Sequence, residues 1–545
     1  MKKSAFTLIA ASALAIASLA LSSCAASGEK KPIDPNFSGG SGIHDILGEN
    51  EKTGGLIYSG GVLTAATDKN ITRAEIAPGT YRISSGAFKG CKKLATVVIP
   101  DSVVIIDDNA FENCVSLKSI TIPDSAEVIG KDAFKGCGDG LFRTSGGIKY
   151  LGDWAIEAEN QSISSAQIKD GIKGIAAGAF MSCTSLSSVT IPDSVENIGK
   201  YAFYNCNNNL YEISGGLKYV DGWLTDVDNL RSSVANVKLD ARGIAAGAFI
   251  FSDKIVSISI SPSVKVIGAQ ALSGASASDV FIAYGIEKIG ALAFENCRSL
   301  EKLTVRDTVT EIGYGAFANC TALHEIEIPG SVTKIAANAF KGCNEKLFTK
   351  ENDLVYVDEW LVGTENMLLR TVDIYDETRG IANGVFAGFE ALESIKLHAR
   401  VKSIGDNAFE NCRSLTSISL PDDIIYLGER AFAGCVSLRT AKLPDSLTEI
   451  KPYSFAKCRA MYFVGFGKEL KTIDENAFQN CQSLISIDMP KVESIGANAF
   501  ADCKNLLEIR FNGTTEEYLT VNVARGAYSS TKLSSITCTD GKAAI

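Results

Sequence analysis

The feature that most constrains this chain is a unit of 23 residues that recurs along most of its length. One copy, residues 404–425, follows the pattern Ile-Gly-x-x-Ala-Phe-x-x-Cys-x-x-Leu-x-x-Ile-x-Ile-Pro, with Leu420 in place of the last Ile. Successive aromatic positions are 23 residues apart, except for two spacings of 22 and three of 46, which is twice 23. These positions are Phe88, Phe111, Phe134, Phe180, Phe203, Phe249, Leu272, Phe294, Phe317, Phe340, Phe386, Phe409, Phe432, Phe455, Phe478 and Phe500.

A repeat of this size predicts a solenoid rather than a string of domains. One unit cannot bury its own apolar face, so neighbouring units must stack. The segment Leu-x-x-Ile-x-Ile alternates, which turns Ile120 and Ile122 inward and Ser119 and Thr121 outward. Val-x-x-Ile-Gly forms a second short extended piece, and Ala-Phe-x-x-Cys packs the opposite wall. We therefore expect a curved rod of short parallel strands, about 4.8 Å per coil, with hairpin insertions and terminal caps.

Each 46-residue gap contains a segment with two apolar runs around a short turn, which predicts a β-hairpin. These insertions lie near residues 141–160, 210–228 and 347–365, and a weaker copy precedes the array in residues 54–82. All three Trp residues of the chain follow these turns. Such aromatics either pack on adjacent coils or form partner-binding anchors. The candidate hairpin aromatics are Tyr150, Trp154, Tyr219, Trp223, Tyr356 and Trp360.

Thirteen of the 15 Cys residues lie three positions after the repeat aromatic. Adjacent coils would place them close enough for disulfides, but odd-numbered runs leave unpaired members, and Ser252, Ala275 and Phe389 fill the same position. No Cys-x-x-Cys cluster with a neighbouring His suggests a metal. We expect a ladder of buried free thiols, with disulfides and a metal site as the weaker alternatives.

Composition excludes several kinds of function. The net charge of −10 disfavours nucleic-acid binding, which requires a basic surface. Three His residues and the lack of any nucleophile elbow, phosphate-binding loop or zinc-protease motif disfavour an enzyme. The sequence therefore predicts a non-enzymatic protein without a cofactor or metal.

The N-terminus predicts export. Lys2 and Lys3 precede an apolar run that ends at Leu21-Ser22-Ser23-Cys24, which is typical of a secretory signal. This end resembles the bacterial lipobox, so we expect residues 1–23 to be a signal peptide and Cys24 to be lipidated. Residues 24–53 then form a flexible tether. Cleavage by an ordinary signal peptidase is the alternative.

The repeat itself resembles the BspA-like (Treponema-type) leucine-rich repeat, through its Ala-Phe-x-x-Cys-x-x-Leu-x-x-Ile-x-Ile-Pro signature in residues 83–506, with a C-terminal cap in residues 507–545. This resemblance implies a lipid-anchored protein at the bacterial cell surface, tied to the membrane only by its lipid. It implies adhesion to a host matrix protein or another bacterium. Glycan binding and a passive envelope scaffold are the alternatives.

Curved solenoids usually bind partners on a concave sheet, so outward positions of the Leu-x-x-Ile-x-Ile strands are the candidate binding residues. Most are Ser or Thr, which also simply suit an exposed strand. The aromatic residues Tyr462, Phe463 and Phe466 interrupt this series of Ser and Thr side chains. Of the three, Phe463 is predicted to point outward. The candidates are Ser119, Thr121, Ser188, Thr190, Lys302, Glu325, Glu327, Ser417, Ser419 and Phe463.

Overall fold

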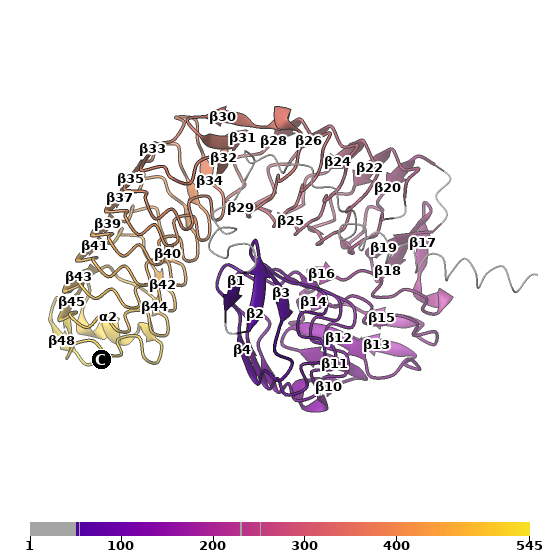
Figure 1. The fold of residues 1–545 in the computed structure, drawn as a ribbon, viewed down its shortest axis with the longest axis horizontal. Helices are drawn as coiled ribbons and strands as arrows, with labels where there is room; N and C mark the ends of the chain where they lie inside the picture. Colours follow the sequence, from indigo (N-terminus) through magenta and orange to yellow (C-terminus); the bar gives the residue numbers. More distant parts are fainter. Residues whose placement is uncertain (1–50, 54, 229–231, 251) are drawn as a thin grey trace, which may run out of the picture. The chain divides into compact units, whose positions relative to one another are not determined.

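In the computed structural model, the 23-residue units form the coils of a parallel solenoid of about 21 turns with almost no helix (Figure 1). The fold class is therefore confirmed. The structure describes residues 51–53, 55–228, 232–250 and 252–545, all within the unit Gly39–Ile545. The predicted signal peptide, Cys24 and the tether up to residue 50 lie outside the described residues. No helix in the described part of the chain is long and apolar enough to cross a membrane.

The Leu-x-x-Ile-x-Ile segments form the first set of strands, which pair in parallel with strands of neighbouring coils in groups of two or three. Together these strands are called ladder A. In β37, Ser417 and Ser419 are exposed and Ile418 is buried, as the alternation predicts. Ladder A comprises β4 (Arg73–Glu75), β6 (Thr96–Val98), β8 (Ser119–Ile120), β13 (Ser165–Gln167), β15 (Ser188–Thr190), β20 (Val234–Asn236), β22 (Ser257–Ile260), β24 (Asp279–Ile282), β26 (Lys302–Thr304), β28 (Glu325–Glu327), β33 (Thr371–Asp373), β35 (Ser394–Lys396), β37 (Ser417–Ser419), β39 (Thr440–Lys442), β41 (Phe463–Gly465), β43 (Ser486–Met489), β45 (Glu508–Phe511) and β47 (Ile536–Cys538).

The Val-x-x-Ile-Gly segments form a second set of parallel strands, ladder B, each only two residues long. The second residue of each pair is Ile, Leu or Val and faces the core in nearly every coil. Ladder B comprises β5 (Arg82–Ile83), β7 (Ile105–Ile106), β9 (Val128–Ile129), β14 (Gly174–Ile175), β16 (Asn197–Ile198), β21 (Gly243–Ile244), β23 (Val266–Ile267), β25 (Lys288–Ile289), β27 (Glu311–Ile312), β29 (Lys334–Ile335), β34 (Gly380–Ile381), β36 (Ser403–Ile404), β38 (Tyr426–Leu427), β40 (Glu449–Ile450), β42 (Thr472–Ile473), β44 (Ser494–Ile495) and β46 (Asn522–Val523).

The Ala-Phe-x-x-Cys segments complete each coil and supply its densest packing. The rings of Phe88, Phe111 and Phe134 stack with centroids 5.0 and 5.3 Å apart. The described cysteines are all free, and the Sγ of Cys114 donates a hydrogen bond to the Phe88 carbonyl oxygen at 3.2 Å. The expected ladder of free thiols is therefore present, and most of its thiols donate to a backbone carbonyl oxygen of the preceding coil.

This segment also explains the recurrent Asn residues. Asn109 and Asn113 have φ values of 58° and 61°, a left-handed conformation that Asn and Gly tolerate better than other residues. Gly86 and Gly90 hold the same positions one coil earlier, with φ values of 67° and 73°. The tight turns on both sides of each Phe therefore limit these positions mainly to Asn and Gly.

The predicted hairpins interrupt the array at the expected places, and in each one the last strand extends ladder B. Trp154, at the start of such a strand, pairs with Gly174 of the next coil. The hairpin strands are β1 (Glu51–Thr53), β2 (Leu56–Ser59) and β3 (Val62–Ala66); β10 (Arg143–Ser145), β11 (Ile148–Leu151) and β12 (Trp154–Ala158); β17 (Glu212–Ser214), β18 (Leu217–Val220) and β19 (Trp223–Val227); and β30 (Thr349–Glu351), β31 (Leu354–Val357) and β32 (Trp360–Thr364). Short 3-10 turns precede the last three sets, at η1 (Asp139–Leu141), η2 (Asn208–Leu210) and η3 (Glu345–Leu347).

The C-terminal residues cover the last coil. Helix α2 (Thr515–Leu519) begins with a capping box between Thr514 and Glu517, and β48 (Gly541–Ala543) pairs antiparallel with β47. The antiparallel partner ends ladder A, because it replaces the next parallel strand.

Ladder B, rather than ladder A, lies on the inner side of the bend of the solenoid (Figure 1). Contacts between distant coils are made at this ladder: Tyr81 stacks on Tyr314 with ring centroids 4.4 Å apart, and Glu127 accepts a hydrogen bond from the Ala291 backbone N–H at 2.7 Å. The expectation that the Leu-x-x-Ile-x-Ile strands form a concave sheet is therefore wrong. The hydrophobic pattern gives the wall of each coil but not the direction in which the stack bends.

Candidate functional site

The candidate residues on the sheet face are all exposed along ladder A. They lie within its strands, except Thr121, which directly follows β8. Phe463 has 48% of its surface exposed, which confirms the predicted orientation. Their roles in binding stay predictions. The residues concerned are Ser119, Thr121, Ser188, Thr190, Lys302, Glu325, Glu327, Ser417, Ser419 and Phe463.

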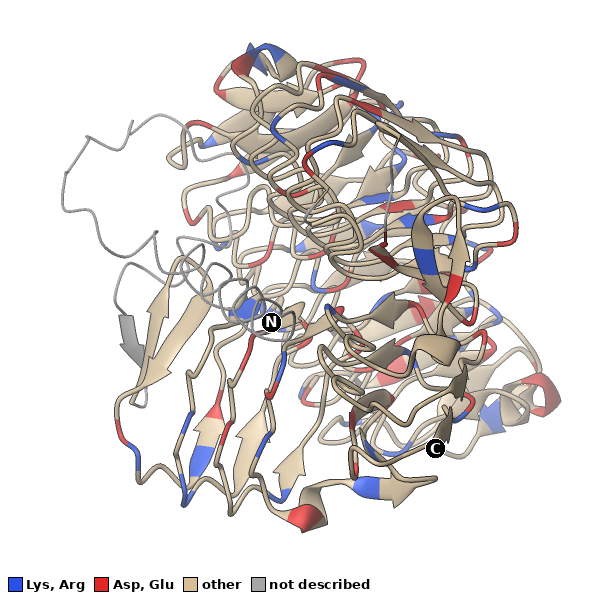
Figure 2. Cartoon of the chain, turned by 90° about the vertical axis from the view of Figure 1, so that its right-hand side faces the viewer, with Lys and Arg blue, Asp and Glu red and all other residues tan. Residues whose placement is uncertain are grey.

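The charges on ladder A are largely balanced across coils. Lys302 and Glu325 form an ion pair between adjacent strands, and this hydrogen-bonded contact raises the pKa of Lys302 and lowers that of Glu325. Arg510 pairs with Asp488 in the same way, at 2.5 Å. Basic and acidic residues are interspersed along the coils (Figure 2). In both ion pairs a basic and an acidic side chain of adjacent ladder A strands offset one another on this face.

The clearest departure from a polar ladder A surface is a row of exposed apolar side chains in three consecutive coils. Tyr462, Ile485 and Leu507 each follow the repeat Leu position and have 55%, 53% and 56% of their surfaces exposed. Phe463 lies beside Tyr462 at the start of β41. These four residues are called the apolar row below.

Sequence reasoning found Phe463 but missed Ile485 and Leu507, because it considered only the strand positions after them. The sequence did contain a signal at the position directly after the repeat Leu. In other coils this position holds a polar residue, as at His324, Glu393 and Arg439. An apolar residue there in three successive coils departs from the polar pattern. Exposed apolar patches of this kind are typical of interaction surfaces.

The hairpin aromatics are buried, which favours packing over recognition. Trp360 is fully buried, and the rings of Tyr219 and Tyr356 lie in the core. The hydroxyl oxygens of these two Tyr residues accept backbone N–H groups of Lys238 and Tyr375, both at 3.0 Å. The six candidates, all nearly or fully buried, are Tyr150, Trp154, Tyr219, Trp223, Tyr356 and Trp360.

The glycines of the next coils explain how each Trp packs. A Cβ atom built on Gly174, Gly243 or Gly380 would lie 2.4–2.5 Å from the Trp ring that covers it. Only glycine leaves room for the indole at these positions. The geometry therefore does not support a partner-binding role for the hairpin Trp residues, because each indole ring is covered by the protein itself.

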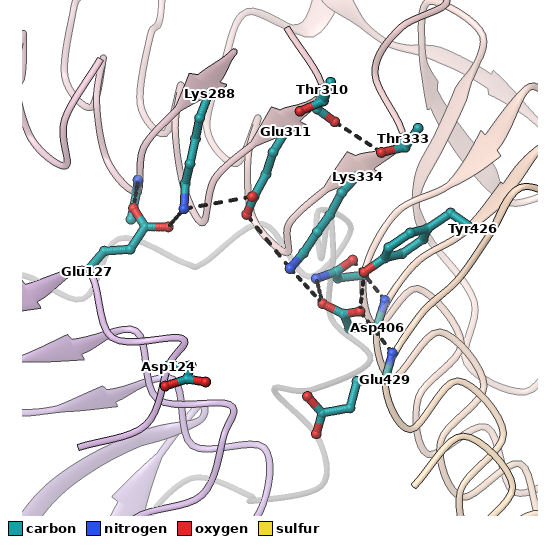
Figure 3. A network of polar contacts seen from close by, with 12 residues as sticks. Asp124, Glu127, Lys288, Thr310, Glu311, Thr333, Lys334, Asp406, Tyr426 and Glu429 are labelled. Carbon is teal, nitrogen blue, oxygen red and sulfur yellow. Dashed lines mark hydrogen bonds and ion pairs between the residues drawn. The ribbon is translucent and has the colours of Figure 1, made fainter. Parts of the chain in front are cut away.

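A chain of alternating charges joins distant coils at ladder B (Figure 3). The Lys288 Nζ lies 3.0 Å from a Glu127 carboxylate oxygen and 3.7 Å from one of Glu311. The Lys334 Nζ in turn lies 3.7 Å from the other Glu311 oxygen and 3.0 Å from an oxygen of Asp406. The charge of Asp406 raises the pKa of Lys334. Burial opposes ionisation of Asp406, but Lys334 outweighs it and holds the pKa of that carboxyl below its usual range.

Glu429 stands at the end of this network, beside a cavity of about 330 Å³. Burial, with the charges of Asp101 and Asp406, raises the pKa of Glu429 to about 7. No group of three or more His, Cys, Asp or Glu residues within the described part of the chain is arranged to hold a metal ion. The network is best explained as a set of contacts that fixes the bend of the solenoid, since most of its groups are satisfied by one another.

Comparison with known proteins identifies the repeat. The family description "BspA type Leucine rich repeat region" matches residues 65–158, 157–236, 242–361, 365–485 and 431–545, in six copies. No curated protein matches the sequence.

The chain is similar to solved structures of bacterial leucine-rich repeat proteins. A leucine-rich repeat protein from Eubacterium ventriosum is 18% identical over 59% of this chain and 94% of its own, with a TM-score of 0.33. A leucine-rich cell surface protein from Faecalibacterium prausnitzii is 21% identical over 87% and 97% of the two chains, with a TM-score of 0.28. A leucine-rich repeat protein from Bacteroides ovatus is 20% identical over 89% and 96%, with a TM-score of 0.22.

Proposed function

The chain belongs to the BspA-type leucine-rich repeat family, and we propose that it is a lipid-anchored, non-enzymatic adhesion protein of the cell surface. Its partner is a protein, either of the host matrix or of another bacterial cell. In this proposal Cys24 is lipidated, and the tether of residues 24–53 holds the solenoid to the membrane.

The observation that carries the proposal is the apolar row. Aromatic residues dominate the binding energy of protein interfaces, and Tyr462 and Phe463 lie side by side there with Ile485 and Leu507 extending the row. A monomeric solenoid gains nothing from exposing four large apolar groups in three successive coils, because each would be more stable buried. Covering them with a partner protein removes that cost.

Adjacent charges give the row a polar rim. Arg510 and Asp488 pair beside it on β45 and β43, and Lys442 lies on the neighbouring strand β39. Protein interfaces commonly have an apolar centre surrounded by polar groups. This arrangement supports a protein partner over a passive scaffold, which needs no such centre.

Attachment of intact cells tests the proposal. Cells producing the full chain are applied to immobilised extracellular matrix proteins and to layers of other bacteria, and compared with cells producing a variant in which Tyr462, Phe463, Ile485 and Leu507 are Ser. The variant should lose at least tenfold in attachment. Val256→Ser is the matched control, because Val256 is exposed at the same repeat position outside the row. Attachment that is equal for all three, or absent for the unaltered chain, contradicts the proposal.

The anchor is tested separately. Incorporation of a labelled fatty acid into the chain should be lost in Cys24→Ser. Added protease should degrade the protein on intact cells. Label retained by Cys24→Ser, or full protection from protease, contradicts the proposed anchor or the proposed exposure.

A further inference from the structure

The three Trp hairpins share one backbone frame but differ in the side chains around it. Only the second combines three Tyr residues with a hydroxyl and a carboxylate at equivalent positions: Tyr201, Tyr204, Tyr211, Thr225 and Asp226. The first hairpin has Asp132, Lys135, Phe142, Ile156 and Glu157 at these positions, and the third has Asn338, Lys341, Phe348, Val362 and Gly363. The hairpin backbone therefore does not itself require the Tyr, Thr and Asp side chains found at the second hairpin.

These side chains line a cavity of about 280 Å³ beside β18 and β19, called the hairpin pocket here. The rings of Tyr201 and Tyr204 meet at 67° with centroids 5.6 Å apart, so they form a corner. The Tyr211 hydroxyl donates to the Phe203 carbonyl oxygen and accepts the Cys206 N–H at 3.1 Å. Tyr211 is thus fixed in place, whereas Tyr204 presents 49% of its surface to solvent.

Polar groups converge on the same space. Asp226 accepts the Val227 backbone N–H at 2.8 Å, and burial raises the pKa of its carboxyl. The Thr225 hydroxyl donates to the Lys218 carbonyl oxygen at 3.2 Å and keeps its lone pairs as acceptors. Asn205 and Asn208 add amide groups at the rim.

The charges of the pocket disfavour an ionic ligand. Lys200 and Lys218 already stand over the faces of Tyr201 and Tyr211, with Nζ 5.0 and 4.9 Å from the ring centroids. A cationic ligand would be repelled by these two ammonium groups, whereas a neutral ligand would not. An anionic ligand would meet Asp226, while Lys218 is already engaged by Asp228 at 3.3 Å.

We propose that the hairpin pocket binds one neutral sugar unit of a glycan. A sugar ring has an apolar C–H face that suits the Tyr201–Tyr204 corner, and its hydroxyls suit the carboxylate, amide and hydroxyl groups opposite. The volume is at the small end of ligand pockets, about 300 Å³, which fits a terminal or single ring rather than a long chain. This site is separate from the apolar row and does not rest on the protein-binding proposal.

The test uses the full chain, purified in detergent, on an array of neutral, sialylated and sulfated glycans. Bound neutral glycans are then titrated, with competition by free glucose, galactose, mannose and N-acetylglucosamine. The variants are Tyr204→Ala, which removes an exposed ring, and Asp226→Asn, which keeps the side-chain shape. Lys135→Ala, the equivalent of Tyr204→Ala in the first hairpin, is the matched control.

The proposal is supported by saturable binding of a neutral glycan whose Kd rises at least fivefold in Tyr204→Ala or Asp226→Asn and less than twofold in Lys135→Ala. The melting temperature and circular dichroism spectrum of each variant are measured alongside the titrations. The Kd of a variant is used only if both measurements match those of the unaltered chain. If the melting temperature or spectrum of both pocket variants differs from that of the unaltered chain, Tyr204→Ser and Asp226→Ser take their place, since Ser lacks both the ring and the carboxylate. Any other pattern overturns the proposal, including binding of charged glycans alone or no saturable binding.

Discussion

Replacing Trp360 with Ala should destabilise the coils around the third hairpin without affecting attachment. The indole is fully buried and covers Gly380 of the next coil so closely that no Cβ would fit. Removing a buried ring of this size leaves a cavity and typically costs about 3–5 kcal/mol. The small residue beneath it cannot fill the space, which places the expected loss in the upper part of that range.

The Trp360→Phe variant sharpens the argument. The indole Nε1 is buried without a hydrogen-bond partner, and an unsatisfied buried donor costs about 1–3 kcal/mol. Phe loses some contact with Gly380 but also removes this donor, so we expect a loss below about 2 kcal/mol. If the indole were instead held for recognition, Phe would be as damaging as Ala to attachment.

Urea unfolding followed by amide hydrogen exchange measures both variants. Exchange is needed because repeat arrays open in parts, so one global midpoint does not report a local loss. Protection should fall first in residues 349–381 for Trp360→Ala. An unchanged urea midpoint with unchanged local protection would refute the packing argument. So would loss of attachment with full stability.

Two further predictions concern titration. Burial, with the neighbouring Cys137 and Cys91, raises the pKa of the Cys114 thiol from 9 to about 12. Because the same thiol ionises near pH 9 in the unfolded chain, the free energy of unfolding should fall as the pH rises from 9 toward 12. Native Cys114 should also resist a thiol reagent at pH 8, and rapid labelling of the folded chain would contradict this. The pKa of Glu429 is about 7 against an ordinary 4.5, so its contribution to stability is full below pH 4.5 and is lost as the pH rises through 7. Glu429→Gln should therefore raise stability at pH 8 by up to roughly 3 kcal/mol and by little at pH 4.5, and equal effects in urea unfolding at the two pH values would argue against it.

Much of the fold follows from local pattern, because each coil is specified by its own residues. Alternation placed Ser417 outward and Ile418 inward, and turn chemistry located the hairpins. The third hairpin was the hardest to predict, because its turn is Asp358-Glu359 and lacks the Gly that the turns of the first two contain. The hairpin at that turn forms nonetheless, with Asp358 at a φ of 53°.

The bend of the solenoid and the contacts across it could not be predicted in the same way. Glu127 and Lys288 lie seven coils apart, and their meeting depends on small rotations summed over every coil between them. The Trp packing had a signal that sequence reasoning did not use. Gly174, Gly243 and Gly380 each follow a hairpin Trp by twenty residues, at a ladder B position that holds larger side chains in most coils.

The parallel ladders also determine how the protein responds to pulling. Their hydrogen bonds run along the solenoid, from coil to coil. Tension between the proposed membrane anchor and the proposed attachment point would therefore load the end coil first rather than all coils together. Each released coil of 23 residues adds about 75 Å of extended chain. An anchored solenoid of this kind would lengthen stepwise under shear, lowering the force on the remaining contacts, and the hairpins would act as stops where the next coil is held by a buried Trp.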